Sequence, residues 1–157
     1  MMLALAAAWL IAAQSPAAEP PPDFWLKVTF GQCVNEAVDT ARATFTRTLS
    51  PGESRTARVV LNAETRRRLY GMLVEANVWA YPQHFTPEDE SRVEEIAPTD
   101  FTIEAHAQGR TTVVEWVDRG SMHPEAVRLR GFLRAVRDLF VAFPEVQVLP
   151  ASRMICL

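Results

Sequence analysis

The sequence predicts an α+β domain, in which an antiparallel sheet of about four to five strands carries two amphipathic helices packed on one face. Three observations lead to this fold class. The stretch DFWLKVTF alternates apolar and polar residues, the stretch DFTIEAHAQGRTTVVEWV alternates on both sides of a turn, and two later segments have apolar residues at helical spacing. Adjacent antiparallel strands with one-sided helices are typical of a two-layer α+β fold.

The domain is expected to begin with two strands. In DFWLKVTF the residues Leu26, Val28 and Phe30 share one face, as a half-buried strand requires. The following VNEAVD indicates a loop or a helical turn. In TARATFTRTL alternate polar residues, mostly threonines, predict a strand exposed on one side, although Arg47 interrupts its apolar face. SPGES then indicates a turn, and TARVVL a short additional strand.

A first helix is predicted from Ala63 to about Ala76, with Asn62 as its N-cap. Its apolar positions, at helical spacing, are Leu69, Met72, Leu73 and Ala76. The three arginines at 66–68 cannot form one flat basic patch, because three consecutive residues sweep about 200° of the helix. They are expected to be solvated or paired with nearby acids.

The clearest local prediction is a hairpin around Gln108 and Gly109. The register of this hairpin pairs Phe101 with Trp116, Ile103 with Val114 and Ala105 with Thr112, which gives one largely apolar face. The other face carries Glu104, His106 and Glu115 among other mostly polar residues. These three could attract a metal ion, but without a fixed ligand motif a solvated strand face is the preferred interpretation, and no metal or other cofactor is expected.

A second helix is predicted from Pro124 to about Ala142, because proline is favoured in the first turn of a helix and His123 precedes it. Pro144 ends this helix, and EVQVLP predicts a brief last strand. Between the two halves of the chain, the acidic stretch from Glu88 to Glu95 lacks the residue pattern of a calcium loop and is interpreted as solvated.

The N-terminus indicates export. Residues 1–13 form an uninterrupted apolar run, shorter than the roughly 20 residues of a membrane-spanning helix. Small residues follow it, which predicts a signal peptide over residues 1–18, cleaved after Ala17 or Ala18. An uncleaved anchor or a buried N-terminal helix is the alternative. Residues 19–23 would form a proline-rich linker, residues 24–157 a single domain, and the cleaved protein would be periplasmic or secreted with no stable membrane span.

The two cysteines are interpreted in the light of that export. In an oxidising compartment Cys33 and Cys156 most simply form one disulfide, which would close a loop of about 120 residues. Zinc binding would need further ligands from only three histidines, and two free thiols are the other alternative.

Composition and motifs disfavour several functional classes. Nineteen acidic residues against sixteen basic ones leave no charge surplus for a nucleic-acid backbone, so no nucleic acid is expected as a partner. The chain has no nucleophile elbow and no phosphate-binding glycine loop, so no catalytic residue is proposed. The best indication of binding is an aromatic cluster flanking Pro82, namely Trp79, Tyr81 and Phe85, which could form a partner surface or plug the end of the core.

Four stretches give the chain a resemblance to small secreted bacterial domains of unknown function: FGQC after the first strand, the helix entry LNAETRRRLY, the hairpin, and the close PEVQVLP. The resemblance covers nearly all of the chain after residue 18 and implies no catalytic residue. We therefore expect an exported, non-enzymatic domain that binds a partner protein or an envelope component. An enzyme or a metal-binding protein with an unrecognised site is the alternative.

Overall fold

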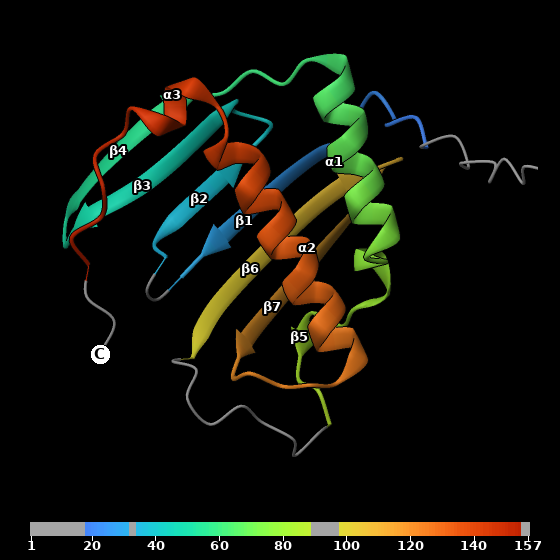
Figure 1. The fold of residues 1–157 in the computed structure, drawn as a ribbon. Coiled ribbons are helices and arrows are strands. Elements are labelled where there is room, and N and C mark those ends of the chain that lie inside the picture. The colour runs from blue at the N-terminus through green and yellow to red at the C-terminus, as the bar shows by residue number, and fades with distance from the viewer. Residues whose placement is uncertain (1–17, 32–33, 89–97, 155–157) are drawn as a thin grey trace, which may run out of the picture.

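The protein folds as one seven-stranded sheet with helices over one of its faces (Figure 1). The structure is a computed structural model, and it describes residues 18–31, 34–88 and 98–154. The strands follow the order β4-β3-β2-β1-β6-β7-β5 across the sheet. Their bounds are β1 Trp25–Phe30, β2 Glu36–Asp39, β3 Thr44–Ser50, β4 Glu53–Arg58, β5 His84–Phe85, β6 Thr99–Ala107 and β7 Arg110–Asp118. All neighbours pair antiparallel except β5 and β7, which are parallel.

The helical layer is formed by α1 Ala63–Glu75, α2 Pro124–Val141 and the short α3 Pro144–Gln147, with a 3-10 turn η1 at Val78–Ala80. Helices α1 and α2 cross the same face of the sheet, and α3 lies by β3 and β4 (Figure 1). Within the described residues no helix is both long and apolar enough to cross a membrane. The single sheet with helices on one face confirms the predicted α+β class. The predicted numbers of strands and helices were too low.

The hairpin is confirmed in its full register. Phe101 pairs with Trp116, Ile103 with Val114 and Ala105 with Thr112, as the alternation required. Its turn residues, Gln108 and Gly109, have φ angles of 53° and 70°, the left-handed conformation that a two-residue hairpin turn needs.

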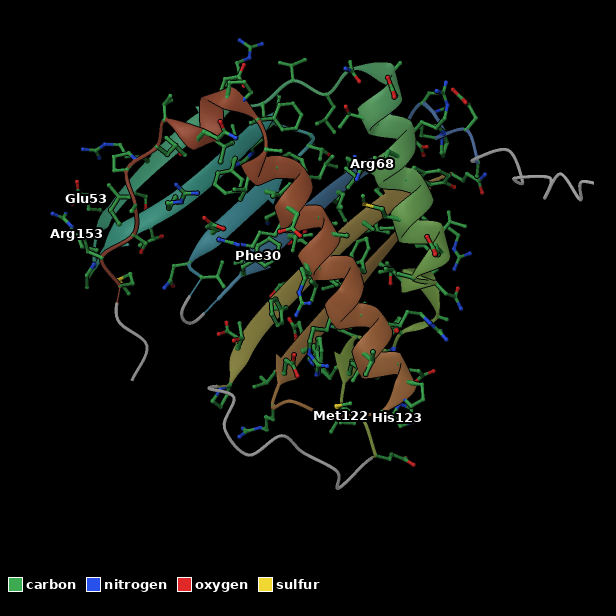
Figure 2. All side chains as sticks on the ribbon, in the orientation of Figure 1. Phe30, Glu53, Arg68, Met122, His123 and Arg153 are labelled. Atoms are coloured by element: carbon green, nitrogen blue, oxygen red, sulfur yellow. The ribbon has the colours of Figure 1, made fainter. Side chains whose placement is uncertain are left out.

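The predicted helix starts are also confirmed. The side chain of Asn62 accepts a hydrogen bond from the backbone N–H of Thr65, and His123 accepts one from Glu125. Figure 2 shows His123 at the start of α2. Both helices end within two residues of the predicted positions.

Three local predictions were wrong. The stretch 34–39 is largely a strand, β2, because it pairs on both sides with β1 and β3. The residues preceding Thr44 form a turn, so β3 begins later than expected. The segment after Pro144 is the helix α3 rather than a strand, and Val146 in it packs into the core.

The core lies between the helices and the facing side of the sheet. Side chains from the central strands β1, β6 and β7 meet apolar residues of both long helices there, and Leu26, Ile103, Leu73, Leu129 and Val136 are almost fully buried. On the opposite face, which no described element covers, the residues are mostly polar, and Thr29, Thr56 and Glu115 are exposed. One buried and one solvated face explain the clean alternation of the strands.

A buried ion cluster joins the sheet to α2. The carboxylate of Glu36, almost fully buried on β2, accepts hydrogen bonds from Nε of Arg47 at 2.8 Å and from Nε of Arg137 at 2.7 Å. Arg47, which interrupts the apolar pattern of β3, therefore has its charge balanced on the helix side of the sheet.

The segment that precedes β1 is held against the domain. The carboxylate of Glu19 pairs with Arg67, and the guanidinium of Arg66 donates to the carbonyls of Pro21, Pro22 and Phe24. Asp23 accepts hydrogen bonds from the backbone N–H groups of Gln108 and Gly109, at 2.9 and 2.7 Å. Two of the three consecutive arginines thus anchor the proline-rich segment.

Asp23 is expected to make stability depend on pH. The hydrogen bonds from the backbone N–H groups of Gly109 and Gln108, with a smaller contribution from His106, lower the pKa of this carboxyl below its ordinary value. A lowered native pKa means that the stabilisation is present above the unfolded-state pKa and is lost as the pH falls through the native value. We expect Asp23→Ala to lower the urea midpoint at about pH 7, and to lower it by less at about pH 2. The control is Asp138→Ala, an exposed carboxylate on α2, which should show no such pH dependence; an Asp23 effect equal at both pH values would contradict the prediction.

Candidate functional site

The candidate site is a cavity of about 530 Å³ at the end of the sheet where β6 begins and β7 ends. Its walls come from three parts of the chain: the exit of β5, the first residues of β6, and the end of β7 with the loop that leads to α2. The cavity exists because β5 pairs with only two residues of β7, which leaves the end of β7 uncovered by that strand. A second groove, between α1 and α2, is smaller, at about 240 Å³.

The inner wall of the cavity is aromatic. Trp116 and Phe85 are buried and Phe101 is partly buried, and Trp116 contacts both phenyl rings, with ring centroids 5.7 Å apart in each case. The hydroxyl-bearing residues Thr86 and Thr102 also line the cavity. An apolar wall with a few polar groups is typical of ligand pockets.

The loop between β7 and α2 is fixed by an ion pair behind the cavity. Arg130 on α2 donates from both Nε and Nη2 to the buried carboxylate of Asp118, and Nη2 also donates to the carbonyl of Ser121. The same carboxylate accepts a hydrogen bond from the backbone N–H of Gly120 at 2.8 Å. The hydrogen bonds between Arg130 and Asp118 raise the pKa of Arg130. The backbone on both sides of Arg119 is therefore held in place.

The side chains of His84 and Arg119 line the cavity in different surroundings. The imidazole of His84 is paired through Nδ1 with Oε2 of Glu115 at 2.8 Å, so its orientation is set by that carboxylate. The guanidinium of Arg119 is exposed, and within the described part of the chain it forms no hydrogen bond or ion pair.

The arrangement suits binding. A histidine held by a carboxylate can accept a proton at its other nitrogen, which is the chemistry of a general base. Among the described residues, however, no hydroxyl is hydrogen-bonded to Nε2 of His84.

The aromatic cluster singled out from the sequence lies mainly in the core. Tyr81 and Phe85 are 8% and 6% exposed, and Trp79 is partly buried and packed against core residues. The hydroxyl of Tyr81 donates to the carbonyl of Glu125 at the start of α2, and burial raises its pKa. Of the three, Phe85 lines the cavity.

The polar hairpin residues are not brought together as a metal site. Glu104 pairs with Lys27, His106 is hydrogen-bonded to Thr111 and lies 3.2 Å from Asp23, and Glu115 pairs with His84. The described ranges contain no group of three or more potential metal ligands. Most of the acidic stretch from Glu88 to Glu95 and the predicted signal peptide lie outside the described residues.

Both cysteines also lie outside the described residues, so the disulfide stays a prediction. The carbonyl of Asn35 accepts a hydrogen bond from the backbone N–H of Thr48. The carbonyl of Leu49, the residue after Thr48, accepts one from the backbone N–H of Arg153. Arg153 also reaches Glu53 on β4 at 2.7 Å (Figure 2). The chain just after position 33 and the chain just before position 156 are thus attached to consecutive residues of β3.

We expect the cysteine pair to be oxidised in exported protein. Alkylation under denaturing conditions followed by intact-mass analysis should label no thiol before reduction and two thiols after it. Cys156→Ser should then expose Cys33 to alkylation without reductant. Two labelled thiols in the unreduced protein would contradict the bridge.

No sequence pattern singles out Arg119 or His84 as a residue of this cavity. The parallel pairing of β5 with β7, which places His84 opposite Glu115, is a long-range contact without a sequence pattern. No protein-family model matches the chain, and no curated protein matches its sequence.

Proposed function

We propose that this protein is an exported, non-enzymatic binding domain, and that it binds a partner protein or an envelope component through the cavity at the end of β6 and β7. Export is inferred from the apolar run over residues 1–13 and the small residues after it. The observation that carries the binding function is the cavity itself, which combines an aromatic wall with accessible polar groups on a fixed loop.

Two further features support binding at this end of the molecule. The opposite end of the hairpin is closed by Asp23, which caps the turn. The aromatic residues beside Pro82 are mostly used in the core and leave little surface for a partner. The cavity therefore offers the best combination of accessible apolar and polar groups in the described part of the chain.

The test is to fill the cavity. Val117 lines it and is 47% exposed, so Val117→Trp should occupy the space with little cost in stability. The control is Val148→Trp, at a site 82% exposed and outside the cavity. We expect the unsubstituted protein and the control to retain a ligand from a native envelope extract, identified by mass spectrometry, and Val117→Trp to lose it. Equal retention by all three proteins, or no retention, would refute the proposal.

A further inference from the structure

We propose that the cavity recognises a carboxylate group on an apolar body, and that Arg119 is the residue that pairs with the carboxylate. This inference rests on the proposed function, since it names the class of ligand for the same cavity.

Arg119 carries a charge that no described residue compensates. Of the acidic residues that line the cavity, Glu115 is paired with His84 at 2.8 Å, and Asp100 has an interaction of its own. The guanidinium of Arg119 has no such partner among the described residues and is exposed. A ligand with a negative group would gain a charge-assisted hydrogen bond there without displacing an existing pair.

The backbone on both sides of Arg119 is also fixed by hydrogen bonds. Its neighbours in sequence are Asp118, bound to Arg130, and Gly120, whose N–H is bonded to Asp118. Gly120 has a φ angle of 78°, a left-handed conformation that other residues adopt at a cost, so the turn is specific. A side chain presented by a fixed backbone loses less entropy when it binds.

The wall determines the rest of the ligand. Phe101, which is partly buried, and Val117, which is 47% exposed, offer apolar surface against which an aliphatic or aromatic group would be removed from water, while Phe85 and Trp116 are almost fully buried and add little accessible surface. A volume of about 530 Å³ has room for an aromatic acid or for the last residues of a peptide. Both ligands share the proposed chemistry.

A carboxylate is favoured over a phosphate because the cavity also contains acids. Glu115 and Asp100 line the same space, and like charges repel a doubly charged phosphate more strongly than a singly charged carboxylate. Arginine forms bidentate hydrogen bonds with a carboxylate, so one guanidinium is sufficient for recognition.

The test uses calorimetric titration with N-acetylphenylalanine, its neutral amide, and phenyl phosphate. We expect the acid to bind at least about tenfold more tightly than the amide and more tightly than the phosphate. Arg119→Gln should abolish the preference for the acid over the amide. The control is Arg110→Gln, an exposed arginine at the other end of β7, which should keep the preference.

Equal affinity for acid and amide, retention of the preference by Arg119→Gln, tighter binding of the phosphate, or no binding of the acid would each overturn the inference. Two further probes separate the sources of the carboxylate. Tighter binding of an acetylated tripeptide ending in phenylalanine than of 3-phenylpropionate would support a peptide C-terminus, and the reverse a small acid. If these probes fail while Val117→Trp still abolishes ligand retention, only the ligand class is wrong and the binding function stands.

Discussion

Replacement of Glu36 with alanine is expected to lower the free energy of unfolding by about 3 kcal/mol, because it leaves the buried guanidinium of Arg47 without a counter-charge, whereas Arg137 is 40% exposed and can be solvated. The side chain of Glu36 is 3% exposed and that of Arg47 is 13% exposed, so water cannot easily replace the lost carboxylate. Arg137, on α2, would lose the hydrogen bond that ties the helix to β2.

The measurement is urea denaturation followed by circular dichroism, with the midpoint and the slope fitted together. The control is Glu53→Ala, a more exposed carboxylate on the edge strand β4 that also pairs with two arginines, Arg55 and Arg153. Exposed pairs contribute about 0–1 kcal/mol, so the control should shift little. Similar losses for both variants would show that the Glu36 cluster is not a buried ion pair in solution.

Replacement of Arg130 with methionine is the second large effect that we expect. The carboxylate of Asp118, which is 7% exposed, would keep its hydrogen bond from the N–H of Gly120 but lose its guanidinium partner. We expect this loss to lower the free energy of unfolding by about 3 kcal/mol. Methionine preserves much of the apolar stem of Arg130. The loss of stability therefore reports mainly on the charge, together with the cation–π contact between Arg130 and the ring of Trp116, at 5.7 Å.

This substitution should also affect the cavity, because Arg130 positions the loop that carries Arg119. Arg134→Met is the matched control, an exposed arginine one turn later on α2. We expect Arg130→Met, and not the control, to lower both the urea midpoint and the affinity for N-acetylphenylalanine. A stability loss without any change in affinity would mean that the loop does not depend on this ion pair for its conformation.

The parts of the fold that were predicted correctly depend on local rules. The hairpin register followed from alternation alone, because a slip by one residue would place Trp116 and Val114 on the solvent side. The helix starts followed from Asn62 and from His123 with Pro124, whose capping geometry involves only neighbouring residues. The α+β class followed from these elements together.

The parts that were missed depend on contacts between distant residues. β2 is short and contains Glu36, a charged residue that becomes stable inside only when Arg47 and Arg137 meet it. β5 is a strand of two residues, which forms only because β7 is beside it. Neither has a periodic signal that could be detected in the sequence.

The sequence by itself determined the α+β class, the central hairpin, the limits of the two long helices and the faces that each buries, because these depend on periodicity and on local hydrogen bonding. Only the tertiary structure decided which charges are neutralised and where a cavity remains. Arg119 differs from the other arginines in its surroundings and not in its sequence signal, and its surroundings exist only after β5, β6 and β7 have come together.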